Sequence, residues 1–224
     1  FLIERYAMAT TPGLTLTSPR PLEREQVQLL AGGLTQGVQG FSALPNVGSE
    51  LDSISKEFPS QTIRDEEFVI DEVQRQIAEG DQAIVHIATH GQFDSDHTKS
   101  FLLAYDDKLT MDRLQSTISS RQFQQEPLEL LVLSACQTAA GDDRAALGLA
   151  GVALNAGARS ALATLWFVND ESTSRMIADF YRQLSTSSNS KAVALQQAQL
   201  ALIRDPRFSH PSFWAPFLLI GNWL

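Results

Sequence analysis

The sequence has only one cysteine among its 224 residues. A single cysteine excludes an internal disulfide framework and fits a reducing compartment, so we expect a cytoplasmic protein. One cysteine and four scattered histidines give no recognisable zinc spacing, so no metal site is expected. No glycine-rich, phosphate-cradling pattern precedes a helix, because Gly32-Gly33 is too sparse, and the sequence therefore predicts no cofactor.

Basic residues and long apolar runs are scarce as well. Lys and Arg number 17 against 26 Asp and Glu, which gives a formal net charge of −9. We therefore expect no direct contact with nucleic acid, which needs clustered basic side chains. No apolar run approaches the roughly 20 residues of a membrane span, and the amino terminus does not resemble a signal peptide. The sequence accordingly predicts no membrane association.

Length and composition are those of an ordinary globular domain. Hydrophobic residues make up 43% and charged residues 19% of the chain, both close to the average. A chain of 224 residues can bury one sizeable core. Because the chain begins at Phe1 rather than Met, we expect residues 1–224 to be a single domain that belongs to a longer protein.

Short apolar runs alternate with helical patterns over most of the sequence. The runs typical of buried strands cover residues 27–33, 61–63, 83–91, 128–138, 159–166 and 217–220. Apolar residues at helical spacing cover 44–58, 68–78, 111–118, 142–156, 171–184 and 191–204. A hairpin is expected at 101–110, and residues 6–10 are a candidate for an added edge strand. This alternation predicts an α/β fold with a doubly wound, mostly parallel sheet flanked by helices.

Two of the strand-like runs end in residues with reactive side chains. The run at 83–91 ends in His90-Gly91, and the run at 128–138 stops in small and polar residues around Cys136. The carboxyl ends of parallel strands lie at one edge of a sheet, where open α/β sheets place their active sites. A thiol and an imidazole at that edge are typical of a nucleophile and its base.

These two residues can share the proton transfers of peptide-bond hydrolysis. A free thiol has a pKa of about 8.5, so Cys136 needs a nearby imidazolium or oriented amides to act as a thiolate. His90 can supply that charge and later protonate a leaving amine. The backbone N–H groups of Gly91 and Cys136 are the natural donors to the oxyanion that forms in between.

Structural roles are the alternative for the same residue types. A cysteine in an apolar run is usually a small buried hydrophobe. The position of Cys136 at a strand end, matched by His90-Gly91 at the end of another strand, nevertheless favours a functional role. His86 lies inside its run, so we expect a hydrogen-bonded core residue there, while His97 and His210 are expected in loops.

These motifs carry a resemblance to a known family. Residues 89–91 (Thr-His-Gly) and 134–138 (Ser-Ala-Cys-Gln-Thr) resemble the dyad of caspase-like (clan CD) peptidases. The caspase signature is Gln-Ala-Cys-[Arg/Gln/Gly]-Gly with a histidine about 50 residues upstream. Here the separation is 136 − 90 = 46 residues, and Ser134 and Thr138 depart from the signature.

The chain is more similar to the CHAT domain, a prokaryotic caspase-like module that is related to separase and commonly attached to tetratricopeptide repeats. The stretches that carry this resemblance are 86–91, 133–138, 147–150, 156–160, 165–171 and 213–217. The resemblance implies a caspase-like fold and a cysteine endopeptidase whose dyad is His90 and Cys136. It also implies a protein or peptide substrate, and a tetratricopeptide-repeat region or another partner that regulates the domain.

The resemblance implies a role for Asp170 too. Residues 165–170 are similar to the stretch that helps to build the specificity pocket of separase-like relatives. Asp170 is therefore a candidate for recognising a basic side chain before the scissile bond. Because Asp is a strong N-cap, Asp170 is alternatively the cap of a helix that begins near Glu171.

Two other functions are compatible with the same sequence. One is a catalytically silent caspase-like domain that serves interaction or regulation, because an intact dyad does not require that the pocket opens. The other is a different acyl-transfer enzyme that uses the same dyad.

Overall fold

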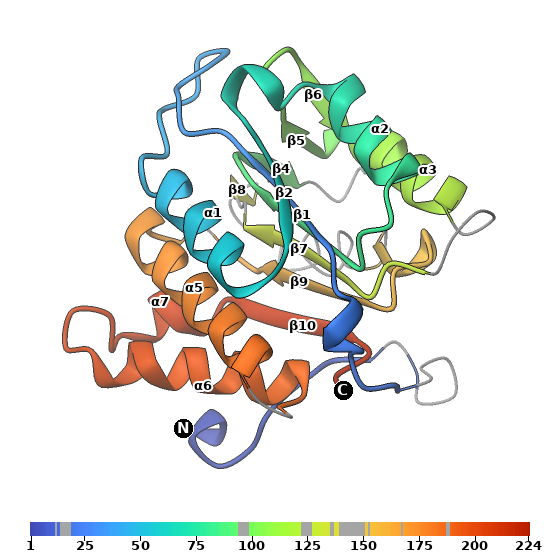
Figure 1. Cartoon of the computed structure of the whole chain (residues 1–224). Coiled ribbons are helices and arrows are strands. Elements are labelled where there is room, and N and C mark those ends of the chain that lie inside the picture. The colour runs from blue at the N-terminus through green and yellow to red at the C-terminus, as the bar shows by residue number, and fades with distance from the viewer. Residues whose placement is uncertain are drawn as a thin grey trace.

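A six-stranded sheet forms the centre of the structure, a computed structural model that describes residues 1–11, 13, 19–93, 99–121, 127–134, 137–138, 151, 153–166, 168–186 and 189–224. The strand order is β10–β9–β7–β3–β1–β2 (Figure 1). The strands are β1 (Leu29–Gly33), β2 (Ser60–Arg64), β3 (Ile84–Ala88), β7 (Leu130–Ser134), β9 (Ser160–Thr164) and β10 (Phe217–Gly221). Neighbouring strands run parallel except β9 and β10, which are antiparallel. The predicted α/β class with a mostly parallel sheet is confirmed.

Helices cover both faces of this sheet (Figure 1). Val85 and Ile87 of β3 belong to the core that also holds the apolar residues of α2 and α3. Ile84 and Ala88 of the same strand belong to the core beneath α1, α5 and α6. Both faces are buried, which explains why the central strands are apolar without alternation. The helices are α1 (Asn46–Glu57), α2 (Ile70–Glu79), α3 (Met111–Arg121), α5 (Asp170–Thr186), α6 (Lys191–Arg204) and α7 (Pro211–Trp214), with short 3-10 helices at Leu2–Glu4, Arg24–Gln26 and Asp65–Glu67.

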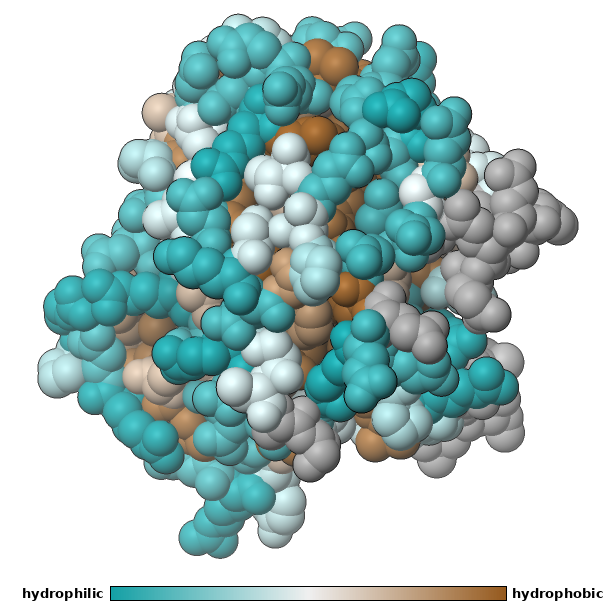
Figure 2. All heavy atoms as spheres, in the orientation of Figure 1, coloured by the Kyte–Doolittle hydropathy of each residue, from teal (hydrophilic) through white to brown (hydrophobic). Residues whose placement is uncertain are grey.

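The outer surface contrasts with these cores. Figure 2 shows one face covered mainly by hydrophilic residues, with apolar atoms visible in the gaps between the covering elements. Among the described residues, no helix is long and apolar enough to cross a membrane.

A second, four-stranded sheet extends the main one, and the sequence predicted only the hairpin within it. Its order is β6–β5–β4–β8, with β4 at Gly91–Phe93, β5 at Phe101–Leu103, β6 at Lys108–Thr110 and β8 at Gln137–Thr138. The antiparallel pair β5–β6 confirms the predicted hairpin. The short strands β4 and β8 were not predicted as separate strands, because the expected runs at 83–91 and 128–138 joined their first residues to β3 and β7. Three and two residues are too few to show a hydrophobic period of their own.

Most of the expected elements recur with shifted ends. The helix expected at 44–58 begins at Asn46, after Pro45, and ends before Phe58, whose backbone is extended. The helix expected at 142–156 lies largely outside the described residues, and so does His97. His210 precedes the short helix α7.

The prediction of an edge strand at 6–10 is wrong for all of that segment except Thr10. Thr10 alone forms an isolated parallel bridge with Ile220 of β10. Its N–H donates to the Leu219 carbonyl at 2.8 Å, and its own carbonyl accepts from Gly221 at 2.9 Å. Tyr6 and Met8 are exposed, so the segment before Thr10 lacks the side-chain burial that would hold it against the sheet.

Close packing at the end of β1 accounts for its glycines. A Cβ added to Gly33 would lie 2.3 Å from the carbonyl oxygen of Ala88 and 2.9 Å from the side chain of Val47. These distances are too short for any side chain. Gly33 therefore allows β1 to pack against β3 and α1.

A buried polar chain links the sheet to two helices. The side chains of Glu50 in α1 and His86 in β3 are at most 1% exposed, and Tyr181 in α5 is fully buried. His86 Nε2 lies 2.9 Å from Glu50 Oε1, and the Tyr181 hydroxyl lies 3.3 Å from His86 Nδ1. Burial, and then the nearby Glu50 carboxylate, raises the pKa of Tyr181 well above its usual value, so its hydroxyl stays protonated and can donate to Nδ1. His86 is the hydrogen-bonded core residue that the sequence predicted.

The hydrogen bond between Glu50 and His86 leads to a testable prediction about stability. Glu50→Ala should lower the free energy of unfolding by about 2–3 kcal/mol, because it leaves the buried Nε2–H of His86 without an acceptor. Glu50→Gln should cost under about 1 kcal/mol, since its amide oxygen can accept the same hydrogen bond. Denaturant unfolding of both variants tests this. Equal losses for Gln and Ala would show that the hydrogen bond contributes nothing.

Candidate active site

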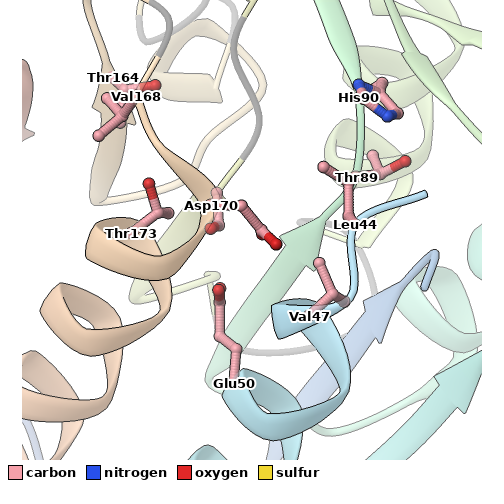
Figure 3. A pocket seen from close by; sticks show the side chains of 10 residues that line it. Leu44, Val47, Glu50, Thr89, His90, Thr164, Val168, Asp170 and Thr173 are labelled. Atoms are coloured by element: carbon pink, nitrogen blue, oxygen red, sulfur yellow. The ribbon is translucent and has the colours of Figure 1, made fainter. Parts of the chain in front are cut away.

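A pocket of about 60 Å³ opens at the carboxyl edge of the main sheet. It lies between the ends of β3, β7 and β9 and the first turns of α1 and α5 (Figure 3). The lining residues are Leu44, Val47, Glu50, Thr89, His90, Ser134, Thr164, Val168, Asp170 and Thr173. Open α/β sheets bind ligands at this edge.

The strand register places His90 between two paired segments. Ala88 at the end of β3 lies opposite Ser134 at the end of β7. Gln92 in β4 then pairs in parallel with Gln137 in β8. Gly91 begins β4 and pairs with Leu102 of β5. The same two chain segments are therefore neighbours before and after the turn that contains His90.

Cys136, the predicted nucleophile, lies outside the described residues, as does its backbone N–H, the predicted oxyanion donor. The neighbours in sequence that are described are Ser134 and Gln137. Among the predicted site residues, the pocket brings together His90 and Asp170.

The ring of His90 is held in one orientation. Its Nε2 lies 2.8 Å from the carbonyl oxygen of Ser42. A carbonyl oxygen only accepts hydrogen bonds, so Nε2 must carry the proton, and Nδ1 is the nitrogen that can take one up. The Phe41 ring packs against the imidazole with centroids 5.2 Å apart. His90 is thus half-buried, and Nδ1 is the ring nitrogen that can accept a proton.

Asp170 links two helices across the pocket. Its Oδ2 accepts hydrogen bonds from the backbone N–H of Asn46 at 3.0 Å and from Asn46 Nδ2 at 2.7 Å. Asn46 is the first residue of α1, whose preceding Pro45 offers no side-chain cap. Asp170 is itself the first residue of α5. Its carboxylate therefore caps the neighbouring helix from across the pocket.

The alternative that Asp170 caps its own helix is wrong. The Oδ1 of Asn169 accepts the hydrogen bond from the backbone N–H of Ser172 at 3.2 Å. Asn169 directly precedes α5, so it occupies the N-cap position that had been assigned to Asp170. The helix begins at Asp170, one residue earlier than predicted, and sequence patterns rarely resolve a difference of one residue.

Glu50 is a second carboxylate at the pocket and was not predicted. Figure 3 shows it extending from α1 toward the space beside Asp170, with His90 at the rim beyond β3. The signal in the sequence is that Glu50 falls between Val47 and Ile54 on the buried face of α1, where a charged residue is unusual. Two carboxylates therefore give the pocket an acidic interior.

The described residues show no metal centre. Among them, no group of three or more His, Cys, Asp or Glu side chains is placed to hold a metal ion. What the pocket offers is an oriented imidazole beside an acidic cavity, which suits proton transfer next to a bound cationic group.

Comparisons with solved structures agree with this architecture. The chain is similar to gingipain R, described as an Arg-specific cysteine proteinase, with a TM-score of 0.63 and 11% identity over 94% of this chain and 50% of that one. It is also similar to a complex of pro- and mature domains of RgpB from Porphyromonas gingivalis, with a TM-score of 0.57 and 10% identity over 99% and 51% of the chains. The Drosophila initiator caspase Dronc matches with a TM-score of 0.52 and 10% identity over 91% and 81%. At these identities the likeness shows the fold, which is caspase-like and shared with cysteine proteases.

Sequence comparison points to the same group. A human relative, tetratricopeptide repeat protein 28, is 35% identical over 100 residues, which is 44% of this chain and 4% of that protein. The chain thus spans a very small part of that relative's length. The sequence model described as the CHAT domain matches residues 1–222. The match covers nearly the whole chain, which therefore belongs to the CHAT domain family.

Proposed function

We propose that this domain is a cysteine endopeptidase in which Cys136 is the nucleophile and His90 the base. The observation that carries the proposal is the register around His90: the paired ends of β3 and β7 continue as the pair β4–β8. Cys136 directly precedes β8 in the sequence. Gln137, the first residue of β8 and the next residue in the sequence, pairs with Gln92, two residues after His90.

The proposed reaction uses the oriented imidazole for every proton transfer. Nδ1 of His90 takes the thiol proton, and the thiolate attacks the carbonyl carbon of the peptide to form a C–S bond. The C–N bond then breaks, the amine leaves with the proton from His90, and a thioester remains. Water attacks the thioester, His90 takes its proton, and the C–S bond breaks to release the carboxylic acid and restore the thiol. The N–H groups of Gly91 and Cys136 would stabilise the oxyanion in both steps.

The proposal has two further parts, a regulatory partner and a location. A tetratricopeptide-repeat region is the proposed regulatory partner, because the curated relative is named for such repeats. A cytoplasmic location is proposed because the nucleophile must stay a free thiol, which a reducing compartment ensures.

Covalent labelling tests the nucleophile. An electrophilic peptide probe should attach to the peptide that contains Cys136, and peptide mapping by mass spectrometry identifies the site without ambiguity in a chain with one cysteine. Cys136→Ala and His90→Ala should each reduce peptide hydrolysis by about three orders of magnitude, because both residues act in one unit. The double variant should lose little more than either single one.

Circular dichroism of the same variants provides the folding control. A folded wild type that neither reacts with the probe nor cleaves peptides would reject the peptidase and favour a catalytically silent regulatory domain. Normal hydrolysis by Cys136→Ala would reject the nucleophile.

We also propose that the pocket recognises a basic side chain before the scissile bond. Asp170 and Glu50 supply its two carboxylates. A guanidinium or ammonium group pairs best with a carboxylate in a partly desolvated pocket. Gingipain R, described as Arg-specific, has the same fold.

Asp170→Asn tests the specificity without removing the cap, because Asn accepts backbone hydrogen bonds about as well as Asp. The preference for Arg or Lys over a neutral residue should fall about 10-fold to 100-fold, since a charge-assisted hydrogen bond contributes about 1.5–3 kcal/mol. Profiling with a peptide library measures the change. Asp52→Asn is the matched control, because that carboxylate lies on α1 but pairs with Arg64 instead of lining the pocket.

A wild type without a basic preference, or an Asp170→Asn profile identical to that of wild type, would reject this role. Asp170 would then serve only as the cap of α1.

A further inference from the structure

An irregular loop between β1 and α1 holds His90 in place. This support loop, residues 34–45, contains the Ser42 carbonyl that accepts from His90 and the Phe41 ring that packs against it. Gln39 has a φ angle of 53°, so the loop turns sharply there. Ser42 and Gln39 are exposed. Burial of apolar side chains therefore cannot order the whole loop, and hydrogen bonds must contribute.

Asp65 anchors the first residues of the support loop. Its Oδ1 accepts from the backbone N–H groups of Thr35 at 2.8 Å and Gln36 at 3.0 Å, and its Oδ2 accepts from the Thr35 hydroxyl at 2.7 Å. Asp65 has a φ angle of 48°, in the left-handed region that few residues other than glycine adopt. Such a conformation persists only where the surroundings hold it. The surrounding structure therefore holds Asp65 in its place beside the loop.

The charge of Asp65 is maintained under ordinary conditions. Burial raises its pKa, but the hydrogen bonds from Thr35 and Gln36 and the charge of Arg64 outweigh burial and hold the pKa below its usual value. A group of this kind stabilises the fold above its unfolded-state pKa and loses that contribution as the pH falls through the lower folded-state value. The carboxylate is therefore ionised at neutral pH, and ionised acceptors form the stronger hydrogen bonds.

The anchor connects to His90 through the backbone. Thr35, whose N–H and hydroxyl donate to Asp65, also uses its carbonyl. That carbonyl accepts a hydrogen bond from the N–H of Leu44 at 3.1 Å. Leu44 lies two residues after Ser42. In the middle of the loop, Gln39 Nε2 donates to the carbonyl of Ala104 at 3.0 Å. The Ser42 carbonyl therefore lies between two hydrogen-bonded residues of the loop, Gln39 and Leu44.

We propose that Asp65 is a positioning residue for His90, because it fixes the support loop and so the Ser42 carbonyl that binds Nε2–H. The inference rests on the proposed function, in which Nδ1 of His90 serves Cys136. Without the anchor, the imidazole loses its fixed acceptor, so other orientations and the other tautomer become populated. The thiolate–imidazolium pair should then form less readily.

The test is the pH dependence of iodoacetamide alkylation at Cys136, followed on its peptide by mass spectrometry in the full chain. His90→Ala should move the midpoint of the profile up toward the free-thiol pKa of about 8.5. Asp65→Ala should move it the same way, with alkylation at pH 7 falling about 3-fold to 10-fold, because one pKa unit changes the thiolate fraction about tenfold. Asp65→Asn should recover part of the loss, since it tolerates the backbone angle and keeps one acceptor.

Two further variants separate positioning from stability. Ser190→Ala removes the side chain that caps α6 through Val193, so it weakens the fold away from the support loop and should leave the profile unchanged. Thr35→Val removes a single bond to Asp65 and should shift the profile less than Asp65→Ala. It also serves if Asp65→Ala does not fold.

The outcomes separate this inference from the peptidase proposal. If His90→Ala leaves the profile unchanged, the dyad itself is rejected. If His90→Ala shifts it while folded Asp65 and Thr35 variants do not, the positioning role of Asp65 is overturned. A shift in Ser190→Ala equal to that in Asp65→Ala would also overturn it, because alkylation would then follow overall stability.

Discussion

The parallel register between β3 and β7 is the constraint on which the rest of the site depends. It sets Ala88 opposite Ser134 and so brings the carboxyl ends of two buried strands to one edge. Both strands then continue into the smaller sheet, where Gln92 pairs with Gln137. A shift of one residue would turn every side chain of a strand to the other face and bury or expose the wrong set. The turn between the two paired segments is therefore fixed by the cores on both faces of the sheet.

The fold was predictable because its signals are local and repeated. The central strands are mostly apolar, with His86 as a hydrogen-bonded exception, as expected for a sheet with two covered faces. Helix α5 has a clear amphipathic pattern, whereas α6 is buried on most of its sides. The small sheet was only partly predictable. Its hairpin has two runs around Asp106-Asp107, whereas β8 pairs with β4, a segment more than 40 residues away in the sequence. Pairing of that kind leaves no periodic trace in the sequence.

The position of His90 at the pocket was predictable from the sequence, whereas the groups that orient its ring were not. His90 was identified because it ends an apolar run. The acceptor for its ring is the carbonyl of Ser42, a group that every residue carries, so no residue type marks it. Asp170 was singled out, but its partner Asn46 is 124 positions away and the predicted cap was displaced by one residue. Glu50 left a trace only as a charged residue on the buried face of a helix.

The bond from Asp170 to Asn46 limits how this position can change during evolution. Oδ2 satisfies the backbone N–H that opens α1 and the side chain of the same residue, while Asp170 itself opens α5. A substitution here must keep an acceptor of the same reach, or the first turn of α1 loses its cap and one of its hydrogen bonds to α5. Asp and Asn meet that requirement, and longer or apolar side chains do not. Sequence drift at position 170 should therefore be narrow in related chains, even where the groups that they bind differ.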